Sequence, residues 1–88
     1  MRSHPHGNEG LTMQISYDAE ADAAYIRIVD AVAPGQAARQ VGFIETPNGV
    51  TQVVLDFDES GRLLGVEVLG ARDGLAPEVL TQAVLPEK

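Results

Sequence analysis

The residues of this sequence best suited to chemistry are acidic, and one group of them has the spacing of a calcium-binding loop. The segment 56–67 fits the pattern D-x-[DN]-x-S-G-x5-E at every required position. Its candidate ligands are Asp56, Asp58, Ser60 and Glu67. A loop of this kind lies between two helices, whereas the residues that flank this segment alternate between apolar and polar and are rich in Val.

A hairpin turn explains the same residues. Asp and Ser favour turns because their side chains bond to nearby backbone N–H groups, and Gly61 accepts a positive φ. Glu67 also lies about 20 Å of extended chain beyond Gly61, too far to return as a ligand. We therefore expect a turn and no metal site; a cation or small-ligand site on Asp56, Asp58, Ser60 and Glu67 is the alternative.

A second acidic group, Asp18, Glu20 and Asp22, lies between two segments of strand-like pattern. Paired carboxylates can act as general acid and base when burial separates their pKa values, which would suit a hydrolase. This turn is flanked by small Ala residues and is expected to be exposed, so capping and solubility are the roles that we favour.

Other catalytic groups are scarce. The single Lys is Lys88 at the end of the sequence, both His (His4 and His6) lie near its start without a third metal ligand beside them, and no Ser lies in a strand–turn–helix elbow. We predict a non-enzymatic protein with no catalytic residues and no cofactor.

The composition indicates one small folded domain. The sequence has 88 residues, of which 44% are hydrophobic and 22% charged, values that are ordinary for a globular chain. Its net charge of -7 is the wrong sign for direct binding to nucleic acid or an anionic membrane. With no Cys, no apolar run of about 20 residues and no apolar core of a signal peptide, it is predicted to be cytoplasmic.

The elements that must position these residues follow from hydrophobic periodicity. Residues 1–11 show no periodicity and are predicted to be a flexible leader, followed by a single β-sheet domain over 12–88. Alternation of apolar and polar residues, interrupted by turn residues, predicts strands over 12–18, 24–29, 37–45, 50–57 and 62–69. A spacing near four predicts a short helix over 77–85, with Pro77 in its first turn.

The predicted fold is α+β and mainly β: a single antiparallel sheet of about five strands in meander order, with the short C-terminal helix on one face. The strand over 62–69 is apolar on both faces, so we place it centrally or at a subunit contact. Arg27 and Arg39 are expected to face away from the apolar side. An open sheet from so short a chain predicts a homodimer, formed through the strand 62–69 or through the Tyr25 face of the strand 24–29.

Two segments in this order, 17–28 and 54–69, carry a resemblance to a known family. The first contains Y-D-x-E-A-D-x-x-Y-I and the second D-x-D-x-x-G-x-x-x-G-V-E-V-L, and both patterns resemble those of the DUF2283 family of small bacterial proteins. The resemblance covers about Met13 to Ala71; the leader, the connection 34–38 and the C-terminal helix depart from it.

The resemblance implies no established activity and supplies no catalytic residue. Some members are similar to antitoxins that accompany small basic toxins of the RelE-like ribonuclease type, and an acidic chain has the right charge to mask a basic toxin. We therefore expect an acidic protein-interaction module with a small basic protein as partner. Its expected partner-binding residues are those of the two acidic turns: Asp18, Glu20, Asp22, Asp56, Asp58 and Glu59.

Overall fold

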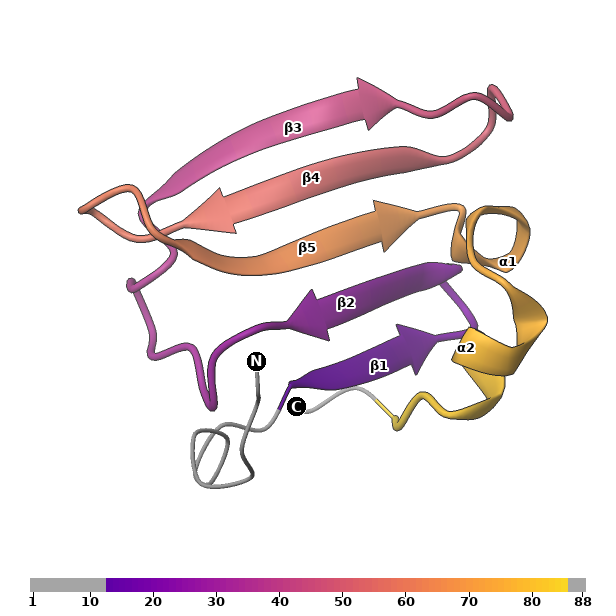
Figure 1. Ribbon diagram of the computed structural model, residues 1–88, viewed down its shortest axis with the longest axis horizontal. Coiled ribbons are helices and arrows are strands. Elements are labelled where there is room, and N and C mark those ends of the chain that lie inside the picture. Colours follow the sequence, from indigo (N-terminus) through magenta and orange to yellow (C-terminus); the bar gives the residue numbers. More distant parts are fainter. Residues whose placement is uncertain (1–12, 86–88) are drawn as a thin grey trace, which may run out of the picture.

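The computed structural model describes residues 13–85, which form one five-stranded antiparallel sheet with two short helices after its last strand (Figure 1). The elements are β1 (Gln14–Asp18), β2 (Ala23–Arg27), β3 (Arg39–Glu45), β4 (Gln52–Phe57), β5 (Leu63–Leu69), α1 (Ala71–Gly74) and α2 (Pro77–Thr81). The predicted class, mainly β with an antiparallel sheet, is confirmed. The predicted leader with His4 and His6 lies outside the described residues.

The strand order is β1-β2-β5-β4-β3, so the predicted meander order is wrong. The connection after β2 crosses to the far edge of the sheet, and the chain then returns through β4 and β5 to pair β5 with β2. The central place predicted for the strand over 62–69 is confirmed by β5. Alternation identifies which side chains share a face, but it does not identify which strands are neighbours.

The register separates the side chains of the sheet into two faces of different character. One face, called the apolar face below, carries Ile15, Tyr17, Ala24, Ile26, Val41, Ile44, Val53, Leu55, Phe57, Val66 and Val68, with Arg39 at one corner. The opposite face, called the polar face, carries among others Ser16, Asp18, Tyr25, Arg27, Gln40, Gln52, Val54, Asp56 and Glu67. Arg27 is therefore on the predicted side, whereas Arg39 is not.

The helices pack on one corner of the apolar face. The core there consists of the buried Ala24, Val68 and Ala71, with Leu75 and Leu80 of the helical region packed against it. The predicted helix over 77–85 is shorter, ending at Thr81, and the sequence patterns did not indicate α1. Within residues 13–85, neither helix is long and apolar enough to cross a membrane.

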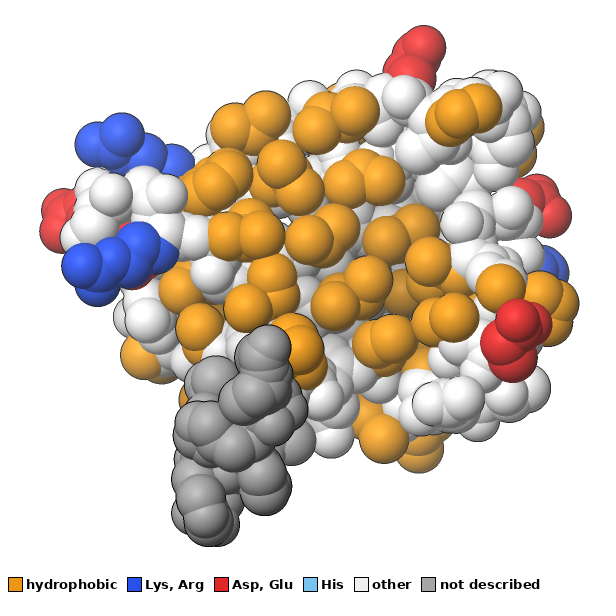
Figure 2. Space-filling view, viewed as in Figure 1, with side chains coloured by type: hydrophobic (Ala, Val, Ile, Leu, Met, Phe, Trp, Pro, Cys, Tyr) orange, Lys and Arg blue, Asp and Glu red, His pale blue; other side chains and the backbone are white. Residues whose placement is uncertain are grey.

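Most of the apolar face is left without a covering layer. Figure 2 shows hydrophobic side chains spread from β3 across β4 and β5 to β2, with charged side chains at the rim. Among the described residues, the buried hydrophobic core is limited to Ala24, Val54, Leu64, Val68 and Ala71. In a two-layer protein such a face is buried against the second layer, whereas in this chain it lies on the surface.

The two edges of the sheet differ. The outer edge of β1 is partly covered by the C-terminal segment, because the Tyr17 N–H donates to the Val84 carbonyl and the Val84 N–H donates to the Ile15 carbonyl, both at 2.9 Å. The opposite edge is β3, in which every residue is exposed. This second edge is the open one.

β3 contains a bulge at Gly42 and Phe43, so its side chains do not alternate strictly between the two faces as the sequence predicted. Phe43 has a φ of 58°, which is unusual for a bulky residue, and the register shifts between Val41 and Ile44. As a result Val41 and Ile44 lie on the same face, opposite Leu55 and Val53, whereas strict alternation had separated them.

Candidate functional site

The acidic turn between β1 and β2 uses its aspartates to hold its own backbone. The Asp18 carboxylate accepts the N–H groups of Glu20 at 3.0 Å and Ala21 at 3.4 Å. Glu20 is exposed, and its side chain takes no part in the hydrogen bonds of this turn. Asp18 therefore caps the backbone of its own turn, which is one of the roles favoured from the sequence.

Asp22 fixes the start of α1, fifty residues further along the chain. Its carbonyl accepts the N–H groups of Gly70 at 2.9 Å and Ala71 at 3.0 Å. Its carboxylate accepts the Arg72 N–H at 2.8 Å and the Tyr17 hydroxyl at 2.7 Å. Asp22 therefore satisfies the N–H groups at the beginning of a helix that has no side-chain cap of its own.

These bonds shift two pKa values in opposite directions. The hydrogen bond from Tyr17, followed by that from the Arg72 N–H, lowers the pKa of Asp22 below its usual 3.8. The bond to Asp22 and desolvation raise the pKa of Tyr17 above its usual 10.0. Each shift favours the protonation state that makes the bond at neutral pH.

The acidic turn between β4 and β5 is a hairpin connection of the predicted kind. The Asp58 carboxylate accepts the N–H groups of Ser60 and Arg62, both at 2.9 Å, and Gly61 has a φ of 86°. A shallow, open depression of about 300 Å³ lies beside this turn, lined by residues of the turn and by Gly35, Gln36 and Ala38. Glu59 is exposed, and its side chain takes no part in the hydrogen bonds of this turn.

Asp56 lies apart from this turn, buried on the polar face. Its carboxylate accepts a hydrogen bond of 2.8 Å from the Gln40 side chain. Tyr25 extends over the neighbouring Gly65, where a Cβ atom would collide with the Tyr25 hydroxyl. Burial, together with the charge of Asp56 beside it, raises the pKa of Tyr25 to about 12.

The structure does not gather the predicted ligands into a metal site. Among residues 13–85, no group of three or more His, Cys, Asp and Glu side chains is close enough to hold a metal ion. Asp56 bonds to Gln40, and Asp58 bonds to the backbone of its turn. The alternative site on Asp56, Asp58, Ser60 and Glu67 therefore receives no support from the geometry.

The two acidic turns also lie far from each other. The β1–β2 turn is at the end of the sheet where the helices pack, and the β4–β5 turn is at the opposite end (Figure 1). Of the six predicted partner-binding residues, Glu20 and Glu59 are the fully exposed ones, and they lie one at each end. The acidic turns are thus two separate surfaces rather than one patch.

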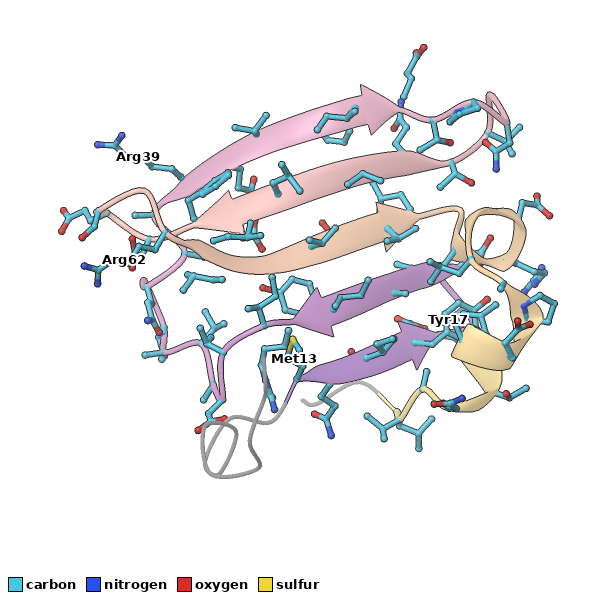
Figure 3. The ribbon with its side chains drawn as sticks, in the orientation of Figure 1. Met13, Tyr17, Arg39 and Arg62 are labelled. Atoms are coloured by element: carbon cyan, nitrogen blue, oxygen red, sulfur yellow. The ribbon has the colours of Figure 1, made fainter. Side chains whose placement is uncertain are left out.

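The apolar face is a broad, uniform surface of the described chain. The sequence patterns indicated an apolar face, and we expected the C-terminal helix to cover it. Figure 3 places Arg39 and Arg62 at one end of the sheet and Tyr17 beside the helices at the other. Between these ends the surface is apolar. Val41 is 51% exposed and Ile44 is 43% exposed, which is high for residues whose neighbours across the strand are Leu55 and Val53.

The Asn48 side chain forms a hub of hydrogen bonds that the sequence did not predict. The next residue, Gly49, has a positive φ of 79°. The Asn48 side chain accepts the N–H groups of Val50 and Thr51 at 2.8 Å and donates to the Thr51 hydroxyl at 2.7 Å. Thr51 in turn donates to the Gly70 carbonyl at 3.0 Å, which ties the β3–β4 loop to the start of α1. A side-chain amide near a Gly is the only signal of this hub in the sequence.

Comparison with known proteins agrees with the motifs. No curated protein and no solved structure gave a significant match to the chain. The family model described as protein of unknown function (DUF2283) matches residues 14–72, which run from the start of β1 into α1. The matched segment covers more than half of the chain and contains both sequence motifs. The chain therefore belongs to the DUF2283 family.

Proposed function

We propose that this protein is a non-enzymatic protein-interaction module. The observation that carries the proposal is the apolar face, most of which is uncovered. Among the described residues it has a single charged residue, Arg39, at its corner. Contiguous exposed apolar surface of this kind marks protein-binding sites in soluble proteins. The aspartates of the acidic turns support the non-enzymatic part of the proposal, because their carboxylates accept hydrogen bonds from backbone N–H groups and so have a structural role.

The charge of the chain defines a second feature of the module. With a net charge of -7, and with exposed Glu20 and Glu59 at the two ends of the sheet, it favours a basic protein as partner. A toxin of the ribonuclease type, masked by this protein as its antitoxin, is such a partner. We place the module in the cytoplasm, where a chain without Cys needs no disulfide.

Reversing the charge of the exposed glutamates tests the electrostatic part of the proposal. Glu20→Lys with Glu59→Lys removes acidic charge at both ends and leaves the aspartates that hold the backbone of each turn unchanged. We expect the affinity for a small basic protein of the ribonuclease-toxin type to fall about tenfold at low salt. Isothermal titration calorimetry measures this affinity directly.

The matched control makes the same change of charge elsewhere. Glu45 ends β3 and Glu78 lies in the first turn of α2, and both are exposed. Glu45→Lys with Glu78→Lys is expected to weaken binding less than the variant of the two turns. Equal affinities for the wild type and the turn variant at low salt would show that the acidic turns do not bind the partner.

A further inference from the structure

We infer that the apolar face is occupied by a second copy of this chain, so that the protein is a homodimer in which two sheets pack face to face. This inference rests on the proposed function only in treating the apolar face as a protein-binding surface. It leaves the acidic ends and the polar face of each copy accessible to a basic partner. Two contacts were expected from the sequence. The strand 62–69 contributes Val66 and Val68 to this interface, whereas the Tyr25 face is the polar face of the sheet.

A second sheet fits the shape of this surface as its cover. The depressions beside the β4–β5 turn and on the polar side of β1 and β2 lie away from the apolar face. Side chains of a sheet face interdigitate with those of a second sheet about 10 Å away, with the strands of the two sheets roughly aligned. The helices pack on only one corner, over Ala24 and Val68, and leave the rest of the face free for this layer.

The area of the face is sufficient for a specific interface. Five strands spaced about 4.8 Å apart, each contributing about six residues of about 3.4 Å, outline about 500 Å². Two copies would therefore bury up to about 1,000 Å², the area that a biological interface should reach. The surface is nearly all apolar, so most of this area contributes favourably to association.

The charge distribution permits self-association of an acidic chain. The described acidic residues lie on the polar face, in the turns, at the ends of the sheet or on the helices, and none lies on the apolar face. Arg39 is at a corner, where its guanidinium can remain in water when the face is covered. Two copies can thus pair without burying an ionised group.

Val41→Asp tests the inference on the face itself. Val41 is 51% exposed, so the monomer loses little packing when it is replaced, whereas the dimer would bury one carboxylate from each copy. Val50→Asp is the matched control, since Val50 is 63% exposed and lies in the β3–β4 loop, outside the apolar face. We expect sedimentation equilibrium to give twice the 9.3 kDa of the chain for the wild type and for Val50→Asp, and a dissociation constant about 100-fold higher for Val41→Asp.

A second variant, with a substitution in the middle of the apolar face, keeps the test valid if Val41→Asp fails to fold. Circular dichroism would reveal such a failure. Leu55→Thr places a hydroxyl at the middle of the face and keeps a residue type that suits a strand; it is expected to weaken dimerisation about tenfold. A wild-type chain that sediments at 9.3 kDa at every concentration would overturn the inference. So would a folded Val41→Asp or Leu55→Thr variant that dimerises as tightly as the wild type. A monomeric chain that still bound the basic partner would leave the proposed function standing.

Discussion

Among single residues, Gly65 of the second family motif leaves the space that the Tyr25 side chain occupies. Gly65 lies beneath the Tyr25 ring, and a Cβ atom there would collide with the ring and its hydroxyl and approach the Ile26 carbonyl at 2.9 Å. The Tyr25 side chain covers the position that a larger residue would fill. This contact gives a packing reason for a glycine in the middle of the central strand.

Gly65→Ala is therefore expected to lower the free energy of unfolding by about 1–3 kcal/mol, because the added methyl group displaces Tyr25 or the backbone. Gly42→Ala is the matched control, since its Cβ would make ordinary contacts of 3.6–3.7 Å with Val54. We expect that variant to stay within about 0.5 kcal/mol of the wild type. Chemical denaturation compares the two; equal losses of stability would contradict the account of Gly65 and Tyr25.

At the scale of elements, Asp22 connects the first hairpin to α1, and its charge makes this connection dependent on pH. The folded-state pKa of Asp22 lies below 3.8 because Tyr17 and the Arg72 N–H donate to the carboxylate. A lowered pKa stabilises the fold above the unfolded-state pKa, and this stability is lost as the pH falls through the folded-state pKa.

Asp22→Asn removes the charge and keeps a residue type that tolerates the φ of 52° at this position. We expect the variant to have a lower denaturation midpoint than the wild type at pH 7, and the difference to disappear as the pH falls below 3.8. Glu20→Gln is the control for the loss of one exposed negative charge in the same turn. A difference between the wild type and Asp22→Asn that stayed constant down to low pH would be inconsistent with this role of Asp22.

Local features of this fold were predictable and long-range ones were not. Alternation of apolar and polar residues identified all five strands. The bulge at Phe43 breaks the alternation on which the prediction of β3 rested. The bond between Asp22 and the Arg72 N–H joins residues fifty positions apart, and periodicity does not report such a contact.

The same distinction between local and long-range features applies to the candidate sites. The turn at Asp58 was predictable because Asp, Ser and Gly act on backbone groups within four residues. The predicted partner-binding residues were grouped by their charge, but the strand order places their two turns at opposite ends of the sheet. The exposure of the apolar face followed from the position of two short helices, which hydrophobic spacing alone does not define.

At the scale of the whole molecule, a single sheet with one apolar face is half of a two-layer structure. The described core of the chain contains a single large side chain that is less than 2% exposed, Leu64. A second copy would supply the missing layer and convert the half-buried residues of the apolar face into a shared core. The stability of the fold is then inseparable from protomer concentration.

If the core forms between two apolar faces, isotope-filtered nuclear Overhauser spectroscopy on a mixture of labelled and unlabelled chains detects the contacts between the two copies. We predict intermolecular contacts from the methyl groups of Val41, Val53, Leu55 and Val66, and none from Leu69, which lies on the polar face. Intermolecular contacts confined to Leu69 and Tyr25, or no intermolecular contacts at all, would contradict the account.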